Sequence, residues 1–207
     1  MRSQEREILD DPDVPEEIAR QAYRELTGFQ RRFGNTTFMV DAIRRDPLPV
    51  RRVMDVGCAT GAVLAEICGE LGVEGVGVDM APRGEGVVRA DAVCDSLPRV
   101  DVAFSMFLAH HLTEQELVGM IRNVGRHARR FIVLDLVRHP IPAMLFRVLV
   151  APFSSAVVAS DGRASFRRAY TAGELAAATR EALGSHGSFR QSVTPLRSRQ
   201  VVDISYE

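Results

Sequence analysis

Two acidic residues stand at or near the ends of short apolar runs. Asp55 lies in the run 53–56, which leads into the small residues of segment 57–61, and Asp79 ends the run 75–79. Open parallel sheets bind ligands outside the carboxyl ends of their strands. Small residues there let a ligand reach the backbone and the free N–H groups that begin the next helix. A carboxylate placed like Asp79 can accept hydrogen bonds from both hydroxyls of a ribose. The pattern therefore predicts a nucleoside site.

The spacing of the small residues and the charge of Asp55 indicate which nucleoside binds. Positions 57, 59 and 61 are spaced by two and two, whereas dinucleotide-binding loops space their glycines by two and three. A carboxylate at the mouth of the loop repels a pyrophosphate, but it attracts the amino group or the sulfonium of S-adenosylmethionine. These features favour S-adenosylmethionine over NAD.

Two of these segments resemble motifs of the class I S-adenosylmethionine-dependent methyltransferases. VMDVGCATG (53–61) resembles their first motif, with Ala59 in place of the central glycine. Gly77-Val78-Asp79 resembles their ribose-binding acidic motif.

Two later segments extend the resemblance. Segment 89–92, followed by Leu97-Pro98, is similar to the stretch whose aspartate, here Asp91, meets the adenine amino group. Segment 101–112 is similar to the fourth-strand motif of the ubiquinone/menaquinone-biosynthesis-like subgroup. The matches span about residues 50–140, and only their combination is specific.

The resemblance implies a set of donor-binding residues. They are Asp55, Gly57, Ala59, Gly61, Asp79, Met80, Asp91, Ala92 and Phe107. For several of these residues a purely structural role stays open. Gly57 and Gly61 can serve only a tight turn, and Asp91 can cap a loop. Met80 and Phe107 can be ordinary core residues.

His110 and His111 are the candidate catalytic residues. Methyl transfer needs mainly alignment of donor and acceptor, but a hydroxyl or thiol acceptor also needs a base, and a neutral imidazole suits that role. In the alternative, each ring only bonds backbone at the entry to the next helix. We expect no metal site, because adjacent histidines on an extended segment point to opposite sides and no nearby acid completes a ligand set.

Short apolar runs alternate with helical segments beyond residue 50, which predicts an α/β fold with a parallel sheet. Expected strands cover 52–56, 75–79, 87–91, 100–105, 131–136, 187–194 and 198–205, and expected helices cover 61–71, 113–128 and 171–183. The fold class is a Rossmann-like, seven-stranded methyltransferase sheet with helices on both faces. The second crossover helix must be reduced, because segment 81–86 is poor helix material.

We divide the chain into an N-terminal helical lid (1–49) and a donor-binding core (50–207) with a substrate-pocket insertion at about 137–170. Expected substrate-binding residues are Tyr23, Arg32, Arg138, Phe146, Arg168 and Tyr170. A diffuse resemblance to polyketide-associated methyltransferases favours the lid and a phenolic acceptor. The N-terminal helices can instead merely cover the sheet. The apolar run of the insertion can line a pocket, form a dimer surface or belong to the core.

The composition of the chain argues against several classes of partner. The formal net charge of -1 and the absence of tryptophan argue against nucleic acid, and no apolar run is long enough for a membrane span. Three cysteines are an odd number, so we expect a reducing, cytoplasmic setting. The chain contains no lysine, which excludes Schiff-base chemistry. We expect a monomer or homodimer.

The leading hypothesis is a bacterial methyltransferase that uses S-adenosylmethionine to methylate a small molecule. The favoured reaction is O-methylation of a phenolic or polyketide-like natural product. The alternative is a methyltransferase-like protein that binds S-adenosylmethionine in a non-methylating or regulatory role. An NAD-dependent oxidoreductase is disfavoured by the loop spacing and by Asp55.

Overall fold

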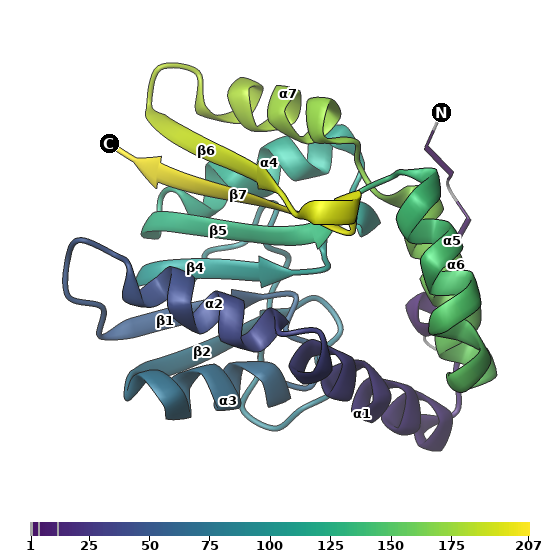
Figure 1. Cartoon of the computed structure of the whole chain (residues 1–207). Helices are drawn as coiled ribbons and strands as arrows, with labels where there is room; N and C mark the ends of the chain where they lie inside the picture. Colours follow the sequence, from purple (N-terminus) through teal and green to yellow (C-terminus); the bar gives the residue numbers. More distant parts are fainter. Residues whose placement is uncertain (1, 4, 12) are drawn as a thin grey trace.

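A seven-stranded sheet occupies the centre of the molecule (Figure 1). The computed structural model describes residues 2, 3, 5–11 and 13–207; positions 1, 4 and 12 of the expected lid lie outside the described residues. The strand order is β3-β2-β1-β4-β5-β7-β6. β7 is antiparallel to both of its neighbours, and the other pairs are parallel. The strands are β1 (Arg52–Val56), β2 (Glu74–Asp79), β3 (Val88–Arg89), β4 (Val100–Met106), β5 (Ala128–Leu136), β6 (Gly187–Val193) and β7 (Arg199–Tyr206).

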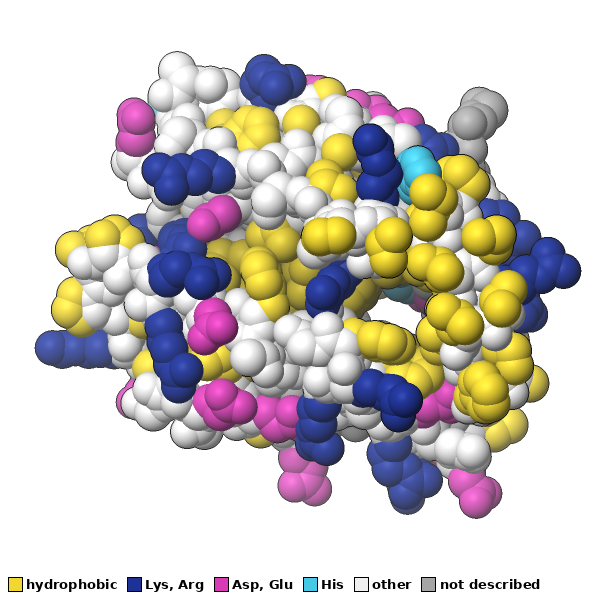
Figure 2. Space-filling view, in the orientation of Figure 1, with side chains coloured by type: hydrophobic (Ala, Val, Ile, Leu, Met, Phe, Trp, Pro, Cys, Tyr) yellow, Lys and Arg dark blue, Asp and Glu magenta, His cyan; other side chains and the backbone are white. Residues whose placement is uncertain are grey.

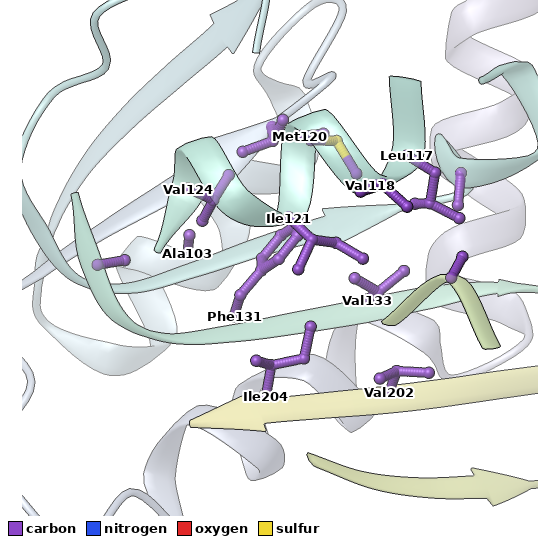
Figure 3. Packing of buried hydrophobic residues seen from close by; sticks show 14 of the residues in the cluster. Ala103, Leu117, Val118, Met120, Ile121, Val124, Phe131, Val133, Val202 and Ile204 are labelled. Atoms are coloured by element: carbon purple, nitrogen blue, oxygen red, sulfur yellow. The ribbon is translucent and has the colours of Figure 1, made fainter. Parts of the chain in front are cut away.

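Apolar side chains alternate between the two faces of the sheet, and each face has its own helices. On one face, Phe131 and Val133 of β5 pack with α4 (Glu114–Val124) and α7 (Ala172–Leu183), and Figure 3 shows Leu117 and Ile121 of α4 above these strands. Ile132 and Leu134 point to the opposite face. There they pack with α2 (Asn35–Arg44) and α3 (Ala62–Leu71). The expected sheet with helices on both faces is confirmed.

The connection between β2 and β3 contains no helix within the described residues. The chain passes from Asp79 to Val88 through turns, as the helix-poor composition predicts. β3 pairs with β2 only at Val88 and Arg89, so the expected strand 87–91 is too long. Both residues are exposed at the sheet edge, where little burial rewards a longer strand.

A wall of helices stands at the carboxyl ends of the parallel strands (Figure 1). It consists of α1 (Glu16–Arg32), α5 (Pro140–Leu149) and α6 (Ala156–Arg168). The insertion thus forms a helical hairpin, with the 3-10 turn η3 (Ala151–Phe153) between its helices. The 3-10 turn η1 (Ile8–Asp10) packs on α6.

The proposed boundary at residue 49 does not separate lid from core cleanly. Met39, Val40 and Ile43 of α2 are fully buried against the sheet, so this helix belongs to the core. Only the segment up to α1 belongs to the wall. Within the described part of the chain, none of the helices has both the length and the apolar character that crossing a bilayer requires.

Candidate functional site

A cavity of about 1120 Å³ lies between the sheet edge and the helical wall. It is lined by the β1–α3 loop, the ends of β2 and β4, and residues of α1, α5 and α6. Figure 2 shows a hollow between the sheet and the wall, bordered by hydrophobic side chains. The cavity therefore lies where an open parallel sheet is expected to bind its ligand.

Backbone geometry accounts for the small residues of the β1–α3 loop. Gly57 has a φ of 79°, and a Cβ atom on it would lie 2.9 Å from the side chain of Leu108. Ala59 also has a positive φ, of 49°. Gly61 caps α3 with a φ of 73° but does not line the cavity. The expected donor contact of Gly61 is thus not supported, and the tight-turn interpretation fits this glycine.

Asp79 ties this loop to the end of β2. Its Oδ2 accepts a hydrogen bond from the Ala59 N–H at 2.8 Å, and its Oδ1 accepts one from the Ala81 N–H at 2.8 Å. A carboxylate offers about four lone-pair sites, so both oxygens can also accept ribose hydroxyls. Asp79 lines the cavity, as the sequence predicts.

Asp55 carries a buried carboxyl group in the cavity. Its side chain lines the cavity although the residue is only 4% exposed. No hydrogen bond reaches its carboxylate from the part of the chain that the structure describes. Burial, and secondarily the charge of Asp79, raises the pKa of Asp55 to about 8. A cation in the cavity would satisfy this group and return it to the ionised form.

The other expected donor contacts also line the cavity. Asp91 lies there with its Oδ1 accepting from the Val93 N–H at 2.8 Å, so it does cap its loop. Ala92 is beside it, and Phe107 lines the cavity with a φ of 60°. Met80 is 68% exposed at the cavity rim, which excludes the core interpretation for this residue.

The two histidines lie in the 3-10 turn η2 (Ala109–His111), not in an extended segment. Their ring centroids are 4.3 Å apart. Both rings lie near Glu7 of the N-terminal segment, with His110 Nε2 3.5 Å from Oε1 and His111 Nε2 3.6 Å from Oε2. The two reasons for expecting no metal site are therefore both wrong. The two imidazole rings lie on the same side, near Glu7, and Glu7 is an acid beside them.

His110 is unsuited to act as a neutral base. It is 3% exposed, and its Nδ1–H donates to Asp135 Oδ1 at 2.7 Å. Burial lowers the pKa of His110, but the charges of Asp135 and Glu7 and the hydrogen bonds to them raise it to about 9. The raised pKa favours the protonated imidazole at neutral pH. This disfavours His110 as the base, and His111 stays the other candidate.

Glu7 is buried within this cluster. The Ser165 hydroxyl donates to its Oε1 at 2.8 Å. Burial favours the neutral carboxyl, but the hydrogen bond from His110 and the charges of both histidines lower the pKa of Glu7. Asp10 lies 3.1 Å from His111 Nδ1 and 2.8 Å from Arg168 Nη1.

Sequence reasoning missed Glu7, Asp10 and Asp135. Asp135 had a usable signal, because it stands near the carboxyl end of β5, next to the end of β4 that leads to the histidines. Glu7 and Asp10 had none, since nothing in the local pattern of the N-terminal segment predicts a contact about 100 residues away.

Four of the six expected substrate-binding residues line the cavity: Tyr23, Arg32, Phe146 and Arg168. Arg138 does not, and its guanidinium instead pairs with Glu174 at 2.5 Å. Tyr170 does not either, because its hydroxyl donates to the Leu112 carbonyl at 2.9 Å and Arg2 stacks on its ring. Neither expected contact is supported by this geometry. The Arg138 guanidinium instead contacts the first turn of α7, and the Tyr170 hydroxyl instead bonds the residue after η2.

Comparison with known proteins gives the same architecture. No protein-family profile matches the chain. The plantazolicin methyltransferase BpumL, solved with SAH, superposes with a TM-score of 0.73 at 12% identity and covers 96% of this chain and 93% of BpumL. The chain has the class I methyltransferase fold.

Two further proteins share part of the chain's length. The mitomycin 7-O-methyltransferase MmcR superposes with a TM-score of 0.53 at 14% identity, over 76% of this chain and 49% of MmcR. Indolepyruvate C-methyltransferase from Streptomyces griseus is 25% identical over 112 residues, which is 43% of this chain and 34% of that protein. The chain thus matches about a third of the length of this curated relative.

Proposed function

We propose that this protein is an S-adenosylmethionine-dependent methyltransferase that acts on a small molecule. The observation that carries the proposal is the buried carboxyl of Asp55, which lines the cavity beside a loop with left-handed backbone geometry and accepts no hydrogen bond from the described residues. A cation in the cavity would favour the ionised form of this carboxyl, whose pKa is raised by burial, so the site suits a ligand that brings a positive charge. S-adenosylmethionine brings two, an ammonium and a sulfonium.

The three aspartates divide the donor among them in this proposal. Asp55 receives the charged methionine end, Asp79 the ribose hydroxyls and Asp91 the adenine edge. All three line one cavity, at the carboxyl ends of β1 and β2 and just after β3. The bound group would supply an activated methyl carbon, while the chain's own residues orient it and exclude water.

The remaining part of the cavity supports an apolar acceptor. Its volume exceeds the range of about 300–1,000 Å³ that is typical of a pocket for one ligand. Phe29, Phe146 and Phe166 from the helical wall line it, and Tyr23 adds a hydroxyl. A flat phenolic or polyketide-like natural product fits this lining, and the named natural-product methyltransferases of similar fold support that class.

Methyl transfer in this cavity depends on alignment. The helices α1, α5 and α6 cover the carboxyl edge of the sheet and would hold acceptor and sulfonium together away from water. His111 is the remaining candidate to take a hydroxyl proton from the acceptor, because its partly exposed ring lines the cavity. The fold itself does not select the acceptor.

Two measurements test the proposal. Calorimetric titration should show that S-adenosylmethionine and SAH bind and NAD does not, since a pyrophosphate would face Asp55. The chain should then release SAH when incubated with donor and a panel of phenols and other aromatic hydroxyl compounds. Donor binding without turnover on any acceptor class would favour the non-methylating alternative, and NAD binding would refute the proposal.

A further inference from the structure

Three side chains in the cavity point one ligand atom each toward a common point. They are Glu7, His110 and His111, and their ligand atoms all lie within 4.8 Å of one another. The imidazole Nε2 atoms stand 3.5 Å and 3.6 Å from the two oxygens of Glu7. Ligand bonds of 2.0–2.1 Å in a tetrahedral zinc site place neighbouring ligands roughly 3.4 Å apart. The two nitrogen–oxygen separations are close to that spacing.

We propose that Glu7, His110 and His111 form a binding site for a divalent first-row transition-metal ion such as Zn²⁺. Two imidazoles and one carboxylate are a ligand set that suits Zn²⁺, Fe²⁺ and their neighbours rather than Mg²⁺ or Ca²⁺. Three protein ligands leave at least one coordination position open.

The two ring nitrogens that face away from the common point are also held by carboxylates. His110 Nδ1 lies 2.7 Å from Asp135, and His111 Nδ1 lies 3.1 Å from Asp10. A carboxylate on Nδ1 fixes the tautomer that leaves Nε2 free to bind a metal, and it orients the ring. Two adjacent histidines that both have this outer partner make an arrangement typical of metal ligands.

The charge of the surroundings is complementary to a dication. Carboxylates at or near the three ligands bring four negative charges, and two nearby guanidinium groups bring two positive charges. The guanidinium of Arg168 contacts two of these carboxylates, whereas that of Arg2 donates to the backbone carbonyls of His110 and Leu112. The carboxylates are Glu7, Asp10, Asp135 and Asp161, and the guanidinium groups are those of Arg2 and Arg168. An ion bound at the two Nε2 atoms would displace the proton that His110 carries there, so both imidazoles would be neutral and the cluster would then lack two positive charges, which a dication supplies. Arg168 lies 3.9 Å from Glu7 and pairs with Asp10, so it neutralises the outer carboxylate rather than the ligand.

The site opens into the same cavity as the donor-binding aspartates. An ion held there would present its open position to the cavity. It could bind a hydroxyl or enol oxygen of the acceptor and lower its pKa, as a bound metal does for water. This role rests on the proposed function, whereas the metal site itself does not.

The ligands come from distant parts of the chain. Glu7 precedes α1, and the histidines follow β4. A bound ion would therefore fasten the N-terminal segment to the core and stabilise the folded chain. In the absence of an ion, the same side chains can form an ion-pair cluster, which is the explanation that a test must exclude.

The test uses the full chain, stripped of metal with a chelator and titrated with Co²⁺ and Zn²⁺. We expect one Co²⁺ per chain, the visible absorption bands of a low-coordinate cobalt site, and a rise in melting temperature with Zn²⁺. Glu7→Gln keeps the size of the side chain and an oxygen for Ser165, and His111→Ala removes a ligand that is partly exposed. Each should weaken Co²⁺ binding at least tenfold. His186→Ala, at an exposed histidine far along the chain, is the matched control and should bind as the parent does.

Circular dichroism would establish whether the variants are folded. If His111→Ala is unfolded, the Co²⁺ affinity of Glu7→Gln alone tests the metal site. Absence of the cobalt bands at micromolar concentrations, or equal affinity in the parent and Glu7→Gln, would overturn the site and leave an ion-pair cluster. Calorimetry with S-adenosylmethionine on the same metal-free protein tests the donor site separately. A metal-binding chain that ignores the donor would refute only the proposed function.

Discussion

Asp135 holds His110 through both of its carboxylate oxygens. Oδ1 accepts from the imidazole Nδ1–H at 2.7 Å, and Oδ2 accepts from the backbone N–H of the same residue at 2.8 Å. Both residues are buried. The pair therefore joins β5 to the turn after β4, and it occupies the Nδ1 atom of a histidine that lines the cavity.

Asp135→Asn should destabilise the chain strongly. Asp135 accepts from three donors, because the Leu136 N–H also donates to Oδ1, and the amide would present an N–H to at least one of them. It also removes the nearer of the two carboxylates that face the buried imidazolium, and breaking a buried pair typically costs about 3–5 kcal/mol. Urea denaturation measures the change. Glu16→Gln is the control, since it removes an exposed ion pair with Arg20 that should be worth about 0–1 kcal/mol. A loss below 1 kcal/mol for Asp135→Asn would mean that the pair does not hold the site.

The fold could be predicted from the sequence where the buried residues of an element follow one another in the chain. β1 has the expected bounds, 52–56, because four successive buried residues follow one exposed residue. β5 begins three residues before the expected start, since Arg129 and Arg130 look like loop residues in the sequence. In the structure Arg130 pairs with Asp203 of β7, and Arg129 pairs with Asp46 and Asp101. Those partners are far away in the chain, so no local pattern could reveal them.

One half of the site could likewise be predicted from the sequence, and the other half could not. Its donor half is assembled from strand ends and the loops directly after them, and Asp55 and Asp79 could be read from the sequence. Its other half brings Glu7 onto His110 and His111 across about 100 residues. Arg168 was expected in the cavity and lies there, but its pairing with Asp10 could not be foreseen.

Donor binding should depend on pH through Asp55. The pKa of this carboxyl is raised to about 8 by burial and by Asp79, and a cationic donor needs it ionised. Below pH 8 the complex must therefore release a proton as it forms, so affinity for S-adenosylmethionine falls toward about tenfold per pH unit between pH 8 and pH 6. Calorimetric titrations across this range measure the slope.

Adenosine is the matched ligand for that experiment, because it carries neither the ammonium nor the sulfonium. Its affinity should stay constant over the same range. Asp55→Asn should flatten the profile for S-adenosylmethionine and weaken binding at pH 8 by roughly 10- to 100-fold, the range that corresponds to a hydrogen bond to a charged group. An unchanged slope in Asp55→Asn would assign the pH dependence to another group.

Asp79→Asn should separate the two roles of Asp79. The amide can accept only one of the hydrogen bonds from the Ala59 and Ala81 N–H groups, so we expect a loss of about 1–3 kcal/mol in the free energy of unfolding. Affinity for S-adenosylmethionine should fall more than tenfold, because the ribose loses an acceptor. Asp91→Asn keeps an oxygen for the Val93 N–H and should change stability less. Full donor affinity in Asp79→Asn would show that the ribose binds elsewhere.

Gly57→Ala should damage the loop that begins the donor site. The backbone there has a φ of 79°, and the new methyl group would lie 2.9 Å from Leu108. Strain of this kind costs about 1–3 kcal/mol, and the loop cannot relax without shifting the Ala59 N–H that binds Asp79. Chemical denaturation should therefore show a destabilised chain, and calorimetry a weaker donor complex.

Gly28→Ala is the matched substitution, because this glycine lies in the exposed interior of α1 with nothing within 4 Å of its added methyl group. It should stabilise the chain by about 0.5–1 kcal/mol and leave donor binding unchanged. Equal effects of the two substitutions would mean that the left-handed geometry of the loop is not what the donor site requires.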